Sequence, residues 1–216
     1  MATRTGPRGG FHLVALPLSP EDSQARVQNL NDSKKTKAMF LFVINCGEVD
    51  KAVLERLVQG LEGVMGSSVR VGEGFMDVEI AYNESRRQYC CSFLLDRVSK
   101  IEEPEALRVL GVADVDLYAP PLKFVFGEAS LGGREAVISL KRLRPEFYGQ
   151  DADEELFALR TLKEAVHELG HTFGLSHCPG TECVMHFSNS LADTDKKAER
   201  FCPRCESQYK NVLSAG

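Results

Sequence analysis

The sequence predicts an α/β fold, in which short strands form a sheet that packs against helices. Two observations support this fold class. Apolar runs of strand length alternate with segments whose apolar residues recur every three to four positions, which is the helical period. The chain also has 216 residues, of which 43% are hydrophobic. We therefore expect one compact domain with a substantial core.

The first half of the chain begins with a polar segment and continues with strand and helix patterns. Residues 1–38 are rich in charged residues, Gly, Pro, Ser and Asn, so we expect a partly disordered N-terminal extension. The apolar run Phe40–Ile44 predicts a strand buried on both faces, and the apolar spacing over 53–64 predicts an amphipathic helix. Short strands are expected at 69–71 and 78–80, and the order of a strand, a helix and further strands predicts a right-handed crossover.

The middle of the chain predicts a second helix and further strands. Residues 86–89 are expected to open this helix, and its predicted buried side consists of Cys90, Phe93, Leu94 and Val98. Segments 107–110 and 115–118 suggest a third inner strand, ended by Pro120-Pro121. Apolar segments 124–126 and 136–138 flank Gly132-Gly133, which indicates a hairpin.

A long helix is predicted to follow. Its start is marked by acidic residues, which the helix dipole favours at that end: Asp151, Asp153, Glu154 and Glu155. Its apolar stripe consists of Leu156, Leu159, Leu162, Val166, Leu169 and Phe173. Two histidines lie beside this stripe, so we expect them to face a cleft.

Those histidines belong to the string HELGHTFGLSH, residues 167–177. Each helical residue turns by about 100°, so His167 and His171 lie on one face, one turn apart. Two imidazoles so placed bind one zinc ion, and Glu168 points to nearly the same face. Glu168 is therefore the candidate general base that deprotonates a zinc-bound water. The alternative is a chance HExxH on an ordinary helix.

A third histidine ligand requires the helix to end. On a continued helix, His177 would lie about 15 Å beyond His167 along the axis and could not reach the same ion. Gly174 favours the left-handed conformation that ends a helix and turns the chain back. We therefore predict that His177 completes a three-histidine zinc site, with a fourth position open for water.

Cysteines near the C-terminus predict a second zinc site. Cys178 adjoins His177, and neighbouring residues seldom ligate one small ion, so we assign them to different metals. The predicted ligands of this site are Cys178, Cys183, Cys202 and Cys205. Four thiolates make a closed, structural site, within about 15 Å of the first ion. The alternatives are four independent thiols, two redox pairs, or a site in which His186 replaces one thiolate.

Charge and cysteine usage limit other functions. The net charge of −5 provides no overall field that favours nucleic acid, and no apolar run approaches the ~20 residues of a membrane span. Seven cysteines, an odd number that includes a CxxC, fit a reducing compartment. Residues 4–18 resemble a secretory signal only faintly. We expect a cytoplasmic monomer that binds neither nucleic acid nor membranes.

The histidine string, continued by Cys178, Cys183, Met185, Cys202 and Cys205, resembles the archaemetzincins, a branch of the metzincin metallopeptidases. Similarity covers about residues 39–210 and includes Arg86–Tyr89, 114–118 and Phe124–Gly127. It implies a metzincin-like mixed twisted sheet packed with helices. The implied catalytic domain, residues 39–210, has an upper subdomain at 39–174 and a small zinc-braced subdomain at 175–210. Residues 211–216 form a tail.

The resemblance implies a zinc-dependent metallopeptidase with a peptide or protein substrate. Lys123–Glu128 then corresponds to the antiparallel edge strand along which a peptide lies, and Met185 to the family's Met-turn methionine. His186 departs from the family pattern, and Phe187 follows it, so no tyrosine is evident there to stabilise an oxyanion. A catalytically silent zinc protein that acts as an interaction module is the first alternative, although it would not need Glu168. The hypothesis of a zinc-ribbon protein that binds nucleic acid is supported by the CxxC motif alone.

Overall fold

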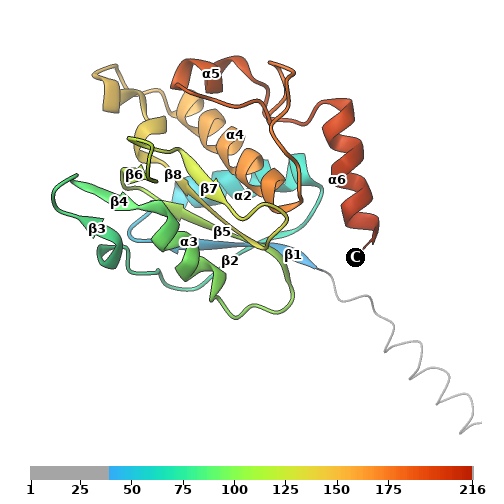
Figure 1. The fold of residues 1–216 in the computed structure, drawn as a ribbon, viewed down its shortest axis with the longest axis horizontal. Coiled ribbons are helices and arrows are strands. Elements are labelled where there is room, and N and C mark those ends of the chain that lie inside the picture. Colours follow the sequence, from blue (N-terminus) through green and yellow to red (C-terminus); the bar gives the residue numbers. More distant parts are fainter. Residues whose placement is uncertain (1–38, 216) are drawn as a thin grey trace, which may run out of the picture. The chain divides into compact units, whose positions relative to one another are not determined.

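The computed structural model describes residues 39–215, and the predicted extension at residues 1–38 lies outside the described residues. A five-stranded mixed sheet forms the centre of the described part (Figure 1). Its strands, in spatial order, are β2 (Val69–Val71), β1 (Phe40–Cys46), β5 (Ala106–Ala113), β8 (Glu135–Ser139) and β7 (Gly127–Ala129). The first four run parallel, and β7 pairs antiparallel with β8 at one edge. The mixed sheet predicted from the family resemblance is confirmed.

Helices cover both faces of this sheet. Helices α2 (Lys51–Met65) and α4 (Glu154–Thr172) pack together over one face, and α3 (Cys91–Ser99) packs on the other (Figure 1). Successive strand residues point to opposite faces, so Leu41 packs beneath α2 and α4 whereas Phe40 packs beneath α3. Both faces of β1 are therefore buried, as its continuous apolar run predicts.

Smaller elements complete the described chain. A second sheet contains β3 (Tyr82–Asn83), β4 (Gln88–Cys90) and β6 (Leu117–Tyr118). Single 3-10 turns are η1 (Glu79–Ala81), η2 (Lys141–Leu143) and η3 (Pro145–Tyr148). After α4 come α5 (Leu191–Lys196) and α6 (Pro203–Ala215). Within the described part of the chain, no helix has both the length and the apolar character needed to cross a membrane.

Helix α6 is fastened to the domain by Tyr209. Its hydroxyl donates a hydrogen bond to the Met65 carbonyl at 2.8 Å, and its ring packs edge-on against Phe173. The helix continues to Ala215, so the boundary predicted between residues 210 and 211 falls inside it.

The helix predicted to open at residues 86–89 begins later. Arg87 has a φ of 54°, which makes the turn between β3 and β4, and residues 88–90 pair with neighbouring strands instead. Helix α3 starts at Cys91, which shifts its buried side to Cys91, Leu94 and Val98. Phe93 was predicted to be buried and is 43% exposed.

Two further expectations about secondary structure were wrong, and a third, the hairpin, was right except for the position of its first strand. Residues 79–81 form the 3-10 turn η1, so no strand occupies 78–80. The single inner strand expected over 107–118 is two strands, β5 and β6, which belong to different sheets. The hairpin around Gly132-Gly133 is present, but its first strand is 127–129. Leu159, placed in the apolar stripe of α4, is 38% exposed.

Candidate active site and cysteine cluster

Helix α4 is bounded by local signals at both ends. The Asp153 carboxylate caps the N-terminus by accepting a hydrogen bond from the Leu156 amide at 2.9 Å. At the other end, Gly174 has a φ of 82°, and its amide donates to the His171 carbonyl at 2.9 Å. The Leu175 amide reaches back to the Gly170 carbonyl at 3.1 Å, which completes a Schellman turn. The chain therefore reverses at Gly174, as its position predicts.

This reversal brings together the three histidines of the motif. One ring nitrogen from each histidine lies within 4.8 Å of those of the other two, and the Nε2 atoms of His167 and His171 are 3.2 Å apart. The Nδ1 atoms of these two rings lie 2.7 Å from the carbonyls of Val184 and Leu175, respectively. Because a carbonyl only accepts, each Nδ1 carries the proton and each Nε2 keeps a free lone pair. The three rings thus fit a shared cation.

Burial favours the neutral form of these rings. It lowers the pKa of His167 well below the ordinary value, and the Lys197 charge lowers it further. Burial also lowers the pKa of His171 and His177. Neutral imidazole is the form that binds a metal, so the electrostatics of the site agree with its geometry.

The Glu168 carboxyl lies in the same cavity, which has a volume of about 360 Å³. It is buried against the edge strand β7: a Cβ atom added to Gly127 would lie 2.6 Å from Glu168 Cγ. Burial raises the pKa of Glu168 well above its ordinary value, and the charge of the neighbouring Glu164 carboxyl is the second largest cause. Because glycine has no Cβ atom, position 127 leaves enough space for the Glu168 side chain.

Lys197 and Glu164 also line this cavity, and neither is among the residues predicted from the sequence. Glu164 could have been found, because it precedes Glu168 by four residues and so shares its helix face. Lys197 carries no comparable signal, because only the folded chain brings residue 197 beside α4.

The segment after His177 packs beneath the histidines. Met185 is fully buried, and a Cβ atom on Gly170 of α4 would lie 2.4 Å from its sulfur. His186 does not join the four clustered sulfur atoms, since its Nδ1 lies 3.1 Å from the Cys178 carbonyl. The Phe187 ring is 4.8 Å from that of His177 and is 47% exposed at the cavity.

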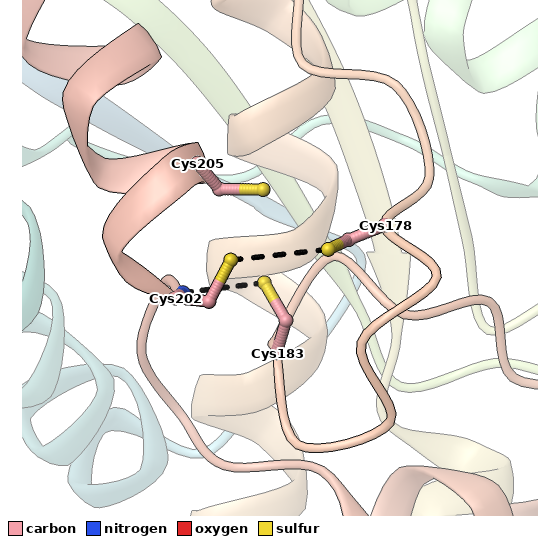
Figure 2. Close-up of side chains that lie close together, drawn as sticks. All are labelled: Cys178, Cys183, Cys202 and Cys205. Carbon is pink, nitrogen blue, oxygen red and sulfur yellow. Dashed lines mark hydrogen bonds between the residues drawn. The ribbon is translucent and has the colours of Figure 1, made fainter.

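The structure also gathers the four cysteines of the C-terminal motif (Figure 2). All four sulfur atoms lie within 4.8 Å of one another, and those of Cys178 and Cys202 are 3.8 Å apart. The Cys202 amide donates to the Cys183 sulfur at 3.3 Å, and a hydrogen bond from the Cys205 backbone lowers the pKa of Cys202 to about 7. The lowered pKa favours the thiolate, which is the metal-binding form, at Cys202, whereas burial raises the pKa of Cys183 and Cys205. This donor set fits a tetrahedral zinc ion.

Comparison with known proteins identifies the family. The model of Peptidase family M54 matches residues 65–211. The chain belongs to this family. An archaemetzincin from Thermococcus kodakarensis is 49% identical over 151 residues, which are 68% of this chain and 81% of that protein. The resemblance to archaemetzincins drawn from the histidine and cysteine motifs is confirmed.

Solved structures agree with this assignment. The crystal structure of an archaemetzincin from Methanopyrus kandleri has a TM-score of 0.71 and 39% identity, and covers 83% of this chain and 98% of that chain. A zinc-dependent peptidase from Methanocorpusculum labreanum has a TM-score of 0.71 and 27% identity, with coverage of 78% and 99%. The M54 chain described here is therefore a metallopeptidase of a zinc-dependent family, and its substrates are peptides or proteins.

Proposed function

We propose that the chain hydrolyses peptide bonds at a zinc ion held by His167, His171 and His177, with Glu168 as general base. The observation that carries this proposal is the convergence of three imidazoles in the cavity that also holds the Glu168 carboxyl. Zinc at this site supplies Lewis-acid chemistry, which polarises the scissile carbonyl and lowers the pKa of water.

The protein itself orients the groups that act. The carbonyls of Val184 and Leu175 fix two imidazoles through their Nδ1 atoms. Glu168 accepts a proton from the attacking water and then returns it to the leaving amine. Packing against Gly127 limits where this carboxyl can move. The arrangement is therefore preorganised for proton transfer on one side of the cleft.

A peptide would bind along β7. This strand forms the edge of the five-stranded sheet, and the residues just before it, 122–126, line the cavity. Arg86 and Gln88 hold this segment by donating hydrogen bonds to the Lys123 carbonyl, each at 3.0 Å. We propose that an extended substrate adds as a further strand to this edge.

The cysteine cluster is proposed to bind a second, structural zinc ion. Four thiolates leave no open coordination position, so this ion would brace the chain that carries His177 rather than take part in hydrolysis. The proposed stoichiometry is two zinc ions per chain, in a monomer that acts in a reducing compartment.

The test of the general base uses Glu168→Ala. We expect this variant to keep two zinc ions per chain, by elemental analysis, and to lose hydrolysis of fluorescein-labelled casein, because only the proton acceptor is removed. Glu73→Ala, which removes an exposed carboxylate, is the matched control and should keep activity. Normal casein cleavage by Glu168→Ala would refute the role of this residue, and an inactive, zinc-loaded native chain would favour the interaction-module alternative.

A further inference from the structure

A buried charge cluster lies beside the active-site helix, and the proposed reaction does not explain it. The side chains of Lys197 and Glu164 are 0% and 5% exposed, and Lys197 Nζ is 4.0 Å from Glu164 Oε2. Glu164 precedes Glu168 by one helical turn on the same face of α4, and its carboxyl adds to the effect of burial in raising the pKa of Glu168. Burying an ammonium ion is costly unless it is paired, so its position here calls for a specific reason.

The fold holds the segment that carries Lys197 firmly against α4. We name residues 194–197 the α5 strap. Arg160 donates two hydrogen bonds to the Asp195 carboxylate, both at 2.7 Å. Lys163 donates to the carbonyls of Thr194 and Asp195, both at 3.1 Å. These contacts come from the same helix as Glu164 and Glu168, so the distance from the strap to these carboxyls is fixed.

The Lys197 ammonium group has few good partners other than the carboxyls. It lies 3.4 Å from His167 Nδ1, but that nitrogen already donates its proton to the Val184 carbonyl. Among residues 39–215, its only other hydrogen-bond acceptor within reach is the His186 carbonyl at 3.5 Å. The Glu164 Oε2 atom has no hydrogen-bond partner within the described residues. The charge of Lys197 is therefore offset chiefly by the two carboxyls.

We propose that Lys197, together with Glu164, is a positioning residue that holds the Glu168 carboxyl in its place in the cavity. This inference rests on the proposed role of Glu168. Lys197 attracts both carboxyls, and Glu164 links it to Glu168 along the helix face. When the ammonium is absent, the two buried carboxyls face each other without a counter-charge, and Glu168 turns away from the position it needs for proton transfer.

A stability comparison that needs no substrate tests the link to Glu168. Lys197→Met is made in the native chain and in a Glu168→Gln chain, and Lys196→Met is the control because Lys196 is 72% exposed. In the native chain, we expect Lys197→Met to lower Tm by about 10 °C, since it leaves buried carboxyls unpaired. In the Glu168→Gln chain the loss should be less than half as large. Equal losses in the two chains would overturn the proposal.

A double variant separates positioning from packing. Adding Glu164→Gln to Lys197→Met removes the unpaired carboxyl, so Tm should recover; this pair of changes also serves if Lys197→Met alone does not fold. On fluorescein-labelled casein, the double variant should show at least a tenfold lower kcat with an unchanged KM, because Glu168 has lost its support. A double variant with native Tm and native kcat would assign Lys197 to stability alone. An inactive native chain contradicts the proposed function, whereas the Tm comparison still decides the role of Lys197.

Discussion

Replacing Gly170 by alanine tests how tightly the chain packs beneath the histidines. The added Cβ would lie 2.4 Å from the Met185 sulfur, 3.1 Å from its terminal methyl and 3.2 Å from the Phe201 ring. Met185 is fully buried and the added atom would lie far inside contact distance of its sulfur, so we expect an overpacking cost of about 2–3 kcal/mol, the upper part of the usual range. Alanine recovers about 1 kcal/mol of this through its higher helix propensity. The net expectation is a loss of about 1–2 kcal/mol.

Thermal unfolding of the zinc-loaded chain measures this loss, which corresponds to a fall in Tm of about 5 °C. The same substitution at Gly63 is the control, because this glycine is also inside a helix but a Cβ there meets nothing within 4 Å. Gly63→Ala should raise Tm through helix propensity alone. If Gly170→Ala raises Tm to the same extent, the predicted clash with Met185 is wrong.

Three further predictions concern the edge strand, the end of α4 and a core thiol. Gly127→Ala should reduce casein hydrolysis at least tenfold while keeping zinc, because its Cβ would lie 2.6 Å from Glu168 Cγ; unchanged kcat would contradict this packing. Arg108→Met should lower stability to urea by about 1 kcal/mol, because the Arg108 guanidinium donates to the Thr172 carbonyl at 3.2 Å in the last turn of α4. Burial raises the pKa of Cys46 from 9.0 to about 12, so the protonated thiol stabilises the fold below pH 9 and this contribution is lost as the pH rises towards 12. Iodoacetamide at pH 8 should therefore label Cys46 only after unfolding, as mass spectrometry can show.

The metal-binding part of the sequence was the easiest to interpret because its geometry is local. Residues four apart on a helix share a face, and glycine at the helix end adopts a positive φ, so the approach of His171 and His177 follows from spacing. The four cysteines are further apart in the sequence, so helix geometry alone does not predict that they meet. Their residue type does, because few roles other than metal binding require four thiols in one short region.

Features that depend on tertiary pairing were not predictable in the same way. The residues around Arg87 have a polar and apolar pattern that suits either a helix start or a strand. Hydrogen bonding between β4 and β6 stabilises the strand here. The contact between Gly127 and Glu168 joins an edge strand to a helix 41 residues later in the chain, and no local pattern reports it. Lys197 was missed for the same reason.

Zinc X-ray absorption spectroscopy on a Cys202→Ser/Cys205→Ser chain gives the most direct test of the central claim. These two changes remove half of the proposed thiolate ligands and leave the histidines intact. We expect one zinc ion per chain, surrounded by nitrogen and oxygen at about 2.0–2.1 Å and with no sulfur shell near about 2.3 Å. A sulfur shell, or a zinc ion whose spectrum is unchanged by His177→Ala, would contradict a site formed by three imidazoles where the chain turns at Gly174.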